Sequence, residues 1–347
     1  MTDPVRRLLF IKPSSLGDIV HAMPTLAALR ARFPHAEVTW LVKRQWAPLV
    51  EAIEGVDQVC AVETGLSGWL GRVPELRAAH FDLVVDLQGL FRSGAMAWLT
   101  GCGRRIGFAN AREGSPLFYT QRVKVPHASM HAVDRYLLVA EALGADRPVQ
   151  PRFDFVDHPQ DRPAVEAILS SAGVVASLPW IAINASARWE TKRWPPQHFA
   201  EAADQLSQAH TLPIVFIGGV AERPEALAVM ALMRTKAVDL TGQTPVGLLP
   251  SLLRQAAVLI TNDSGPMHIA AAVGTPVVAL FGPTDPRRTG PYGRGHLILS
   301  QAVECSPCFR RDCTRAARLE CLTGVKPDQV VRAVQQQLAP SSKQRLL

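Results

Sequence analysis

Short runs of Val, Ile and Leu recur along the chain and alternate with stretches in which apolar residues follow the helical period of about 3.6. The runs lie at residues 8–11, 37–42, 81–87, 180–184, 214–217, 257–261 and 276–281. Continuous apolar strands separated by helices are typical of parallel sheets that helices cover on both faces. The pattern therefore predicts an α/β protein built on doubly wound parallel sheets.

The runs fall into two sets, separated by a proline-rich stretch that begins at residue 147 and is followed by a helical pattern at residues 161–172. Such a stretch is typical of a connection between domains. We expect an N-terminal Rossmann-like domain over residues 1–155, a connection over 156–178, a C-terminal Rossmann-like domain over 179–325, and a final helix and tail over 326–347. Within this last part, residues 327–338 have the helical pattern and residues 341–345 form a polar tail.

The composition agrees with two globular domains and indicates what kind of molecule the protein binds. The chain has 347 residues, of which 48% are hydrophobic and 19% charged, enough to build two cores. Its 37 Lys and Arg against 30 Asp and Glu give a net charge of +7, which favours an anionic partner. Aromatic residues make up only 6% and do not interleave with the cations, so the sequence argues against a nucleic-acid groove.

Neither the first apolar run of the chain nor its longest apolar stretch predicts an export signal or a membrane-spanning helix. The first run, residues 8–11, is followed at once by Lys12 and Pro13, too soon for the core of a signal peptide. The longest apolar stretch, residues 269–281, contains Gly274 and Pro276 and is shorter than a spanning helix. We expect a protein that is not exported and that contacts membranes only peripherally.

The first chemically informative segment lies where strand one should turn into a helix, and it reads KPSSLGDIVH over residues 12–21. Ligands bind at the carboxyl ends of strands in such sheets. Gly17 permits a tight turn, and Asp18 would face the crevice from the first helical turn. The alternative is that Ser14, Ser15 and Asp18 merely cap the helix. The segment has neither the dinucleotide-binding nor the P-loop glycine pattern.

A second segment, TNDSGPMHI at residues 261–269, follows an apolar run and precedes a small-residue helix. Pro266 suits the first helical turn, while Ser264 and Gly265 leave backbone N–H groups free to bind a diphosphate. Asp263 would repel phosphate if it pointed inward, so we assign it to hydrogen bonding of the loop or of ligand hydroxyls. For His268, a satisfied semi-buried histidine is as good an interpretation as a ligand contact.

The third segment, residues 184–195, carries Arg188, Lys192 and Arg193 after the first strand of the second domain. Cations at a strand end neutralise a leaving diphosphate. A solvated loop would explain the charges, but it explains less well why Trp189 and Trp194 flank them.

Together these segments resemble the ADP-heptose:lipopolysaccharide heptosyltransferases of glycosyltransferase family 9, because several motifs occur in the family's order. They are KPSSLGDIVHAMP (residues 12–24), DLQGLFRS (86–93), AREGSPLFY (111–119), HAVDR (131–135), KRWP (192–195) and NDSGPMHIAAAVGTPVVALFGPTDP (262–286). The third and fourth look most like heptosyltransferase I. The resemblance implies the GT-B fold, with two Rossmann-like domains facing a central cleft.

The resemblance also implies roles for individual residues. Asp18 would be the general base and Lys192 the diphosphate clamp. Donor binding would involve Ser186, Lys192, Glu222, Asp263, Ser264, Gly265 and His268. The acceptor would contact Ser14, Ser15, Arg92, Ser93, Arg105 and Arg112. The reaction implied is inverting transfer of heptose from ADP-L-glycero-D-manno-heptose to Kdo-lipid A or heptosyl-Kdo-lipid A.

The same resemblance implies a cytoplasmic enzyme, peripheral to the inner leaflet of the inner membrane, whose acceptor is an anionic lipid A-linked core. No nucleic-acid partner is expected. The chain has no Asp-x-Asp pair, the usual holder of a metal on a nucleotide-sugar diphosphate, so we expect no metal and no cofactor. Positive groups would replace the metal in stabilising the leaving ADP.

One feature departs from heptosyltransferase I. Cys305, Cys308, Cys313 and Cys321 form a cluster more like that of heptosyltransferase II-like members, which leaves the acceptor open between the first and second heptose transfer. The cysteines would bind zinc or remain reduced thiols in a packed loop, and their spacing favours the thiols. Other functions also stay open, namely a transferase that uses another heptose donor or acceptor, a nucleotide-sugar isomerase or epimerase of the same two-domain architecture, and a non-catalytic nucleotide-sugar-binding module.

Overall fold

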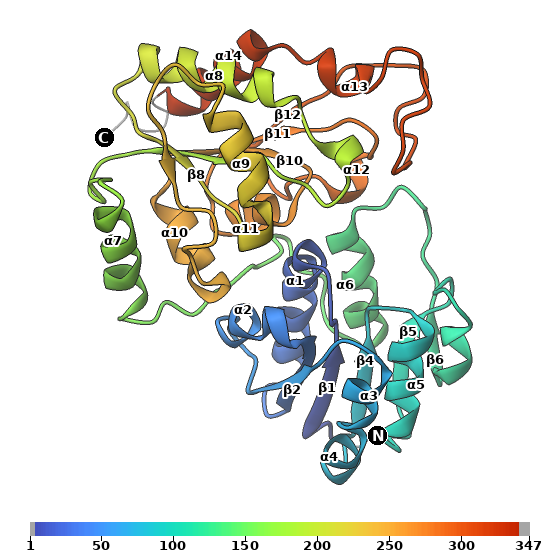
Figure 1. Ribbon diagram of the computed structural model, residues 1–347. Coiled ribbons are helices and arrows are strands. Elements are labelled where there is room, and N and C mark those ends of the chain that lie inside the picture. Colours follow the sequence, from blue (N-terminus) through green and yellow to red (C-terminus); the bar gives the residue numbers. More distant parts are fainter. Residues whose placement is uncertain (1–3, 340–347) are drawn as a thin grey trace. The chain divides into compact units, whose positions relative to one another are not determined.

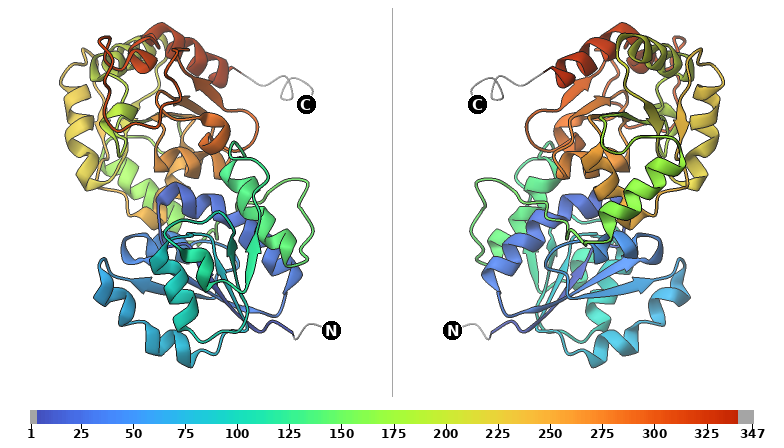
Figure 2. Two further views of the ribbon diagram at one scale, coloured as in Figure 1. Left: turned by 90° about the vertical axis from the view of Figure 1, so that its right-hand side faces the viewer. Right: turned by 90° about the vertical axis from the view of Figure 1, so that its left-hand side faces the viewer.

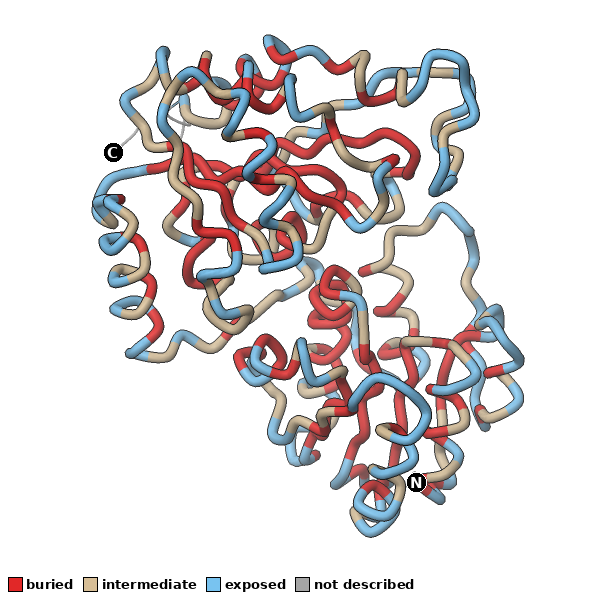
Figure 3. Tube along the Cα trace, viewed as in Figure 1, coloured by how far each residue is buried: buried red, intermediate tan, exposed pale blue. Residues whose placement is uncertain are grey.

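The structure, a computed structural model, describes residues 4–339 and divides into two compact units, Met1–Val156 and Asp157–Leu347. Each unit is an α/β layer structure with its strands in the interior (Figures 1 and 3). The polar tail expected at residues 341–345 lies outside the described residues. No helix between residues 4 and 339 combines the length and the apolar character that crossing a bilayer requires.

Unit 1 is built on a six-stranded parallel sheet in the order β3-β2-β1-β4-β5-β6. The strands are β1 (Arg7–Ile11), β2 (Glu37–Lys43), β3 (Gln58–Val62), β4 (Leu83–Asp86), β5 (Arg105–Phe108) and β6 (Gln121–Val123). The chain leaves β1 toward β2 and later returns to β4 on the other side of β1. The gap between the carboxyl ends of β1 and β4 is therefore the switch point where ligands bind in doubly wound sheets.

Helices cover both faces of this sheet (Figures 1 and 2). On one face, α3 (Leu66–Leu70), α4 (Val73–Ala78) and α5 (Phe91–Leu99) place Trp69, Leu76 and Met96 against the β1 residues Leu9 and Ile11. On the other, α1 (Leu16–Arg32) packs against α6 (Ala132–Ala142), and Phe10 contacts Trp40 at 4.6 Å between ring centroids. A short helix, α2 (Ala47–Glu51), follows β2. Alternate residues of β1 thus point into two cores, as a strand covered on both faces requires.

Unit 2 repeats the design with a second six-stranded parallel sheet, in the order β12-β11-β10-β7-β8-β9. The strands are β7 (Ile181–Asn184), β8 (Ile214–Phe216), β9 (Val238–Asp239), β10 (Val258–Asn262), β11 (Val277–Leu280) and β12 (Leu297–Leu299). Numbered from β7, the order read from β9 is the same 3-2-1-4-5-6 as in unit 1. Its switch point lies between the carboxyl ends of β7 and β10.

The helices of unit 2 also lie on both faces of the sheet (Figure 2). They are α7 (Asp161–Ser171), α8 (Pro196–Ala209), α9 (Arg223–Met230), α10 (Leu249–Gln255), α11 (Gly265–Ala272), α12 (Pro286–Thr289), α13 (Glu320–Thr323) and α14 (Pro327–Leu338). Helices α8, α9 and α14 bury Phe199, Val229 and Val330 in one core. Helix α7, which the sequence suggested belongs to a connection, packs against α10 of this unit.

The predicted α/β class and parallel sheets are confirmed, and each of the seven predicted runs is a strand. Five further strands of the described chain, β3, β5, β6, β9 and β12, were not predicted. Strands β3, β6, β9 and β12 are the edge strands of the two sheets, and β5 lies next to β6. Edge strands are half-covered and tolerate polar residues, as Gln121 in β6 and Asp239 in β9 illustrate. Their apolar signal is correspondingly weak.

Candidate active site

Asp18 lies beside the switch point of unit 1, at the third position of α1. Its Oδ2 accepts hydrogen bonds from the backbone N–H of Ser15 (3.0 Å) and from the Ser15 hydroxyl (2.8 Å). Its Oδ1 accepts from the hydroxyl of Tyr136 at 3.1 Å, and the Lys12 Nζ lies 3.8 Å from the same oxygen. The helix-capping contact considered from the sequence is therefore present. It occupies one carboxylate oxygen only, and 39% of the side chain remains exposed.

The surroundings hold Asp18 in its ionised form. Burial alone would raise the pKa of its carboxyl, but the charge of Lys12, with His21 and the Ser15 hydrogen bonds, outweighs burial and holds that pKa well below its usual range. Burial also opposes the charge of Lys12, yet Asp18, Tyr136 and Asp86 raise the pKa of that amine above its usual value. The Asp18 carboxyl is therefore ionised at neutral pH.

The turn after β4 lies at the other side of the same switch point and leads into α5, whose second residue is Arg92. The turn begins at Asp86, whose side chain is fully buried. Its carboxylate accepts hydrogen bonds from the N–H groups of Gln88 (2.8 Å) and Gly89 (3.2 Å) and from the Tyr119 hydroxyl (2.7 Å). Gly89 has a φ of 65°, a left-handed conformation that favours glycine. The Arg92 guanidinium lies 5.6 Å from the ring centroid of Trp69.

Arg112 is joined to this turn through its backbone. Its N–H donates to the Gly89 carbonyl at 2.9 Å, while its side chain is exposed and has no ion-pair or hydrogen-bond partner within residues 4–339. Ser14 is half-buried and Ser15 is exposed in the turn before α1. Arg112 and the two serines therefore belong to turns that follow β5 and β1 in unit 1, and Arg92 lies in the first turn of α5, which follows β4.

Two of the predicted acceptor residues are engaged elsewhere. Ser93 is fully buried, and its hydroxyl donates to the Leu90 carbonyl at 2.9 Å while accepting from the Leu90 N–H at 3.1 Å. Arg105 is the first residue of β5, at the end of the sheet where the strands begin. Its guanidinium donates to the carbonyls of Phe118 and Cys102. The sequence expectation is corrected for both: Ser93 caps α5, and Arg105 ties loops together at the edge opposite the switch point.

Lys192 lies in the turn after β7, at the switch point of unit 2. Its Nζ is 2.7 Å from the Asp263 Oδ2, and the same oxygen accepts a hydrogen bond from the Thr284 hydroxyl at 2.7 Å. The Lys192 ammonium also lies 4.7 Å from the ring centroid of Trp189. Asp263 therefore holds the lysine in place. Only 6% of its side chain is exposed, against 17% for Lys192, so the cation is the more accessible partner.

Helix α11 begins two residues after Asp263, the acidic partner of this ion pair. The Ser264 hydroxyl donates to the Asn184 Oδ1 at 2.8 Å and contacts the Thr261 hydroxyl, so it does not cap the first turn of α11. The helix begins at Gly265, with Pro266 in its first turn. Uncapped backbone N–H groups and the helix dipole together favour an anion at this position.

Asn184, the last residue of β7, links the remaining donor-site candidates. Its Nδ2 donates to the Ile217 carbonyl at 3.1 Å and contacts the Glu222 Oε2 at 3.5 Å, and that oxygen also accepts from the Gly219 N–H. Glu222 is half-buried, so part of its carboxylate reaches solvent. Ser186 and His268 are almost fully buried, with 4% and 7% of their surfaces exposed.

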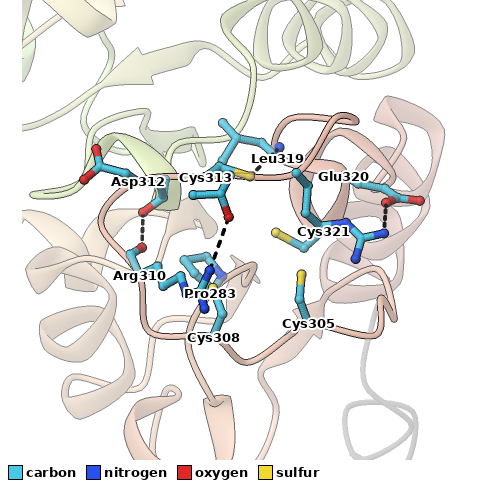
Figure 4. A pocket seen from close by; sticks show the side chains of 12 residues that line it. Pro283, Cys305, Cys308, Arg310, Asp312, Cys313, Leu319, Glu320 and Cys321 are labelled. Atoms are coloured by element: carbon cyan, nitrogen blue, oxygen red, sulfur yellow. Dashed lines mark hydrogen bonds and ion pairs between the residues drawn. The ribbon is translucent and has the colours of Figure 1, made fainter.

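The cysteine cluster forms a pocket that Thr191, the residue before Lys192, also lines. Lys192 itself is not among the residues that line this pocket. Cys305, Cys308, Cys313 and Cys321 line a cavity of about 330 Å³ together with Thr191 (Figure 4). The Thr191 hydroxyl donates to the Arg310 carbonyl at 2.9 Å, and Arg318 pairs with Glu190 at 2.8 Å. The loop that carries the cysteines therefore supports the turn that positions Lys192.

The thiols of this pocket are free. Burial, together with the neighbouring Cys305, Cys308 and Cys313, raises the pKa of Cys321 to about 11, so its thiol is protonated at neutral pH. Within the described part of the chain, no three His, Cys, Asp or Glu side chains form a group able to hold a metal ion.

Several residues of the two sites were not singled out from the sequence. Tyr136 contacts Asp18 across 118 positions of the chain, and Asn184 meets Ser264 across 80. No local pattern indicates such pairs. Lys12 is different, because a lysine directly after a buried apolar strand signals a buried or snorkelling cation.

Two doubly wound units, one with an ionised carboxylate at its switch point and the other with a lysine and an open helix N-terminus, define a class of protein: an enzyme of the GT-B fold. Within that class the chain belongs to glycosyltransferase family 9, the heptosyltransferases, whose family model matches residues 72–317. The predicted family and the predicted glycosyltransferase activity are confirmed.

Individual relatives agree with this assignment over most of the chain. Lipopolysaccharide heptosyltransferase 1 of Pseudomonas aeruginosa is 29% identical, with 89% of this chain and 87% of the relative covered. Lipopolysaccharide heptosyltransferase 2 of Escherichia coli is 28% identical, with coverages of 82% and 85%. Among solved structures, a family 9 glycosyltransferase of Veillonella parvula matches with a TM-score of 0.85 at 25% identity, covering 97% of this chain and 98% of that one.

Proposed function

We propose that the protein transfers heptose from ADP-L-glycero-D-manno-heptose to the inner core of lipopolysaccharide, with inversion at the anomeric carbon and without a metal. The observation that carries the proposal is the division of chemistry between the units. Unit 1 presents the ionised carboxylate of Asp18, whereas unit 2 presents Lys192 and the uncapped N-terminus of α11. A proton acceptor and an anion site are the two elements that transfer from a sugar diphosphate requires.

In this mechanism Asp18 takes the proton of the acceptor hydroxyl as its oxygen attacks the anomeric carbon from the side opposite ADP. The bond to the diphosphate breaks as the new bond forms, and the electron pair leaves with ADP. Lys192 and the backbone N–H groups at the start of α11 stabilise the growing negative charge. Asp263 keeps Lys192 aimed at that position, since the two groups lie 2.7 Å apart.

Donor recognition would rest on residues of unit 2 that surround the β7–β10 switch point. Glu222 offers a half-buried carboxylate to the ribose hydroxyls. Ser264 and Gly265 open α11 toward the diphosphate, and Ser186 and His268 line the same region with little exposed surface. The proposal places the cysteine loop outside the reaction, as a support for the Lys192 turn.

The acceptor would be anionic and linked to lipid A at the cytoplasmic surface of the inner membrane. We assign its recognition to the exposed side chains of Arg92, Arg112 and Ser15, with Ser14 beside them. Arginine suits both carboxylates and phosphates because its guanidinium donates in pairs. Relatives named lipopolysaccharide heptosyltransferase 1 and lipopolysaccharide heptosyltransferase 2 are about equally similar to this chain, at 29% and 28% identity, so we keep both Kdo-lipid A and heptosyl-Kdo-lipid A as candidate acceptors.

Replacing Arg112 by Ala is expected to raise the Michaelis constant for the acceptor about tenfold, because a charge-assisted pair contributes about 1.5–3 kcal/mol. The constant for ADP-heptose should stay nearly unchanged. Steady-state kinetics with each substrate varied in turn measure both. Arg122→Ala removes an exposed arginine from β6 of the same unit and serves as the control. Loss of donor binding with intact acceptor binding would show that the two sites are assigned to the wrong units.

Activity is expected to survive EDTA, because no carboxylate pair is proposed to hold a metal on the diphosphate. Initial rates of ADP release before and after chelation, with and without added Mg²⁺, test this. A rate that falls with EDTA and returns with Mg²⁺ would contradict the metal-free mechanism.

The experiment that separates transfer from isomerisation is a measurement of ADP formation with and without acceptor. A transferase releases ADP in proportion to added acceptor. An epimerase or isomerase changes the nucleotide sugar in the absence of acceptor, and a binding module releases no ADP under either condition.

A further inference from the structure

Lys12 is a buried cation that the proposed reaction does not yet use. It directly follows β1, is 3% exposed, and donates from Nζ to the Leu87 carbonyl at 3.3 Å. Its Nζ lies 3.8 Å from the Asp18 Oδ1 and 5.1 Å from the ring centroid of Tyr136. A charge is expensive to bury unless an opposite charge accompanies it. Lys12 and Asp18 therefore depend on each other electrostatically.

Tyr136 completes the surroundings of the same carboxylate oxygen. It projects from α6, is 5% exposed, and donates its hydroxyl hydrogen to the Asp18 Oδ1 at 3.1 Å. Ser15 meanwhile holds Oδ2. Each oxygen of Asp18 thus has a fixed donor, and the carboxylate cannot rotate without breaking one of them.

We propose that Lys12 and Tyr136 are positioning residues, which keep Asp18 ionised and hold its Oδ1 in one orientation. The inference rests on the proposed function, since it explains how the base is prepared for the acceptor hydroxyl. Neither residue touches the reacting atoms in this scheme. Both act through Asp18.

The other charged and titratable groups around the pair come from three elements. They are His21 of α1, Asp86 at the end of β4, and Arg135 and His131 at the start of α6. Burial is the strongest influence on Asp18 and favours the protonated form, and Lys12 is the strongest influence that opposes it. The ionised state of Asp18 therefore depends on Lys12 more than on any other side chain.

Lys12→Met is expected to remove the cation and leave the burial in place. The pKa of Asp18 should then rise from its wild-type value, because the strongest influence that lowers it is gone while burial still opposes ionisation. Activity would fall about tenfold for each pH unit below the raised pKa, because one proton inactivates the base. Raising the pH would restore it. Asp86, whose pKa burial already raises, can take up a proton when the cation is lost, so the variant avoids a second unpaired charge.

Tyr136→Phe keeps the ring and removes only the hydroxyl. Loss of one hydrogen bond to a charged group should raise the pKa of Asp18 by about one unit. Less exact positioning should also lower kcat about tenfold, with little change in the Michaelis constant for ADP-heptose. Tyr119→Phe is the matched control, because Tyr119 is also buried but donates to Asp86 instead of Asp18. It should leave the Asp18 titration unchanged.

The decisive experiment combines pH–rate profiles with ¹³C NMR titration of the Asp18 carboxyl, assigned by comparison with Asp18→Asn. A raised carboxyl pKa in both variants, with a new acidic limb in the rate profile of Lys12→Met, supports the inference. An unchanged carboxyl pKa in both variants overturns it, whatever happens to activity. A raised carboxyl pKa with a flat rate profile keeps the inference about Lys12 and Tyr136 and instead contradicts Asp18 as the base. Tyr136→Phe also covers the case in which Lys12→Met does not fold.

Discussion

Asp18→Asn is expected to abolish nearly all transfer while leaving donor binding intact. The amide has almost the size of the carboxylate but accepts no proton, so the rate should fall by a factor on the order of 10²–10⁴. Donor affinity should be retained because we propose the diphosphate site for unit 2, whereas Asp18 belongs to α1 of unit 1. Single-turnover rates and calorimetric titration with ADP-heptose measure the two quantities separately.

The control must allow for the capping role of Asp18. Because its Oδ2 accepts from Ser15, the substitution also weakens the start of α1, at a cost of about 1 kcal/mol. Asp328→Asn makes the same change in the first turn of α14, where the carboxylate is exposed. Thermal unfolding of both variants shows how much of any loss is structural. Near wild-type turnover in a folded Asp18→Asn protein would exclude Asp18 as the base.

Lys192→Ala is expected to weaken ADP-heptose binding and to slow the chemical step as well. The charge that Lys192 meets grows as the bond to ADP breaks, so its contribution is greater in the transition state than in the ground state. Loss of a single such group lowers kcat by about 10²–10³. The effect is expected to be large because 83% of the side chain is shielded from solvent, the complement of its 17% exposure, which limits compensation by water.

Two further variants sharpen this test. Lys236→Ala removes an exposed lysine of the same unit and should change neither constant. Asp263→Asn leaves the Lys192 charge but removes the carboxylate 2.7 Å away, so donor affinity should fall less than in Lys192→Ala. Unchanged affinity and rate in Lys192→Ala would mean that the lysine serves only its ion pair with Asp263.

The general architecture could be predicted from the sequence because it rests on local patterns. Buried strands such as β1 and β10 are continuous apolar runs, and Pro266 marks the start of α11. The positions of Asp18 and Lys192 followed from the same logic, since each lies in the segment after the first strand of its own unit, β1 or β7, beside that sheet's switch point. The edge strands β6 and β9 could not be predicted, because short half-covered strands carry polar residues.

The side-chain partners could not be predicted, because they join positions far apart in the chain. Nothing near Asp18 in the sequence indicates Tyr136, and nothing near Ser93 indicates that its hydroxyl would cap α5 instead of facing the acceptor. Arg105 was assigned from charge placement combined with the family resemblance. Its position at the amino edge of β5 depends on where the strand begins, which a four-residue strand does not reveal.

The central claim, transfer of heptose to the lipopolysaccharide core, is tested most directly by mass spectrometry of the products formed from ADP-heptose and a panel of truncated core acceptors. The account predicts an acceptor that gains the mass of one heptose, with one equivalent of ADP released, for either Kdo-lipid A or heptosyl-Kdo-lipid A. Asp18→Asn should form this product at no more than about a hundredth of the wild-type rate. An unmodified acceptor across the whole panel, with ADP-heptose consumed or isomerised, would contradict the account.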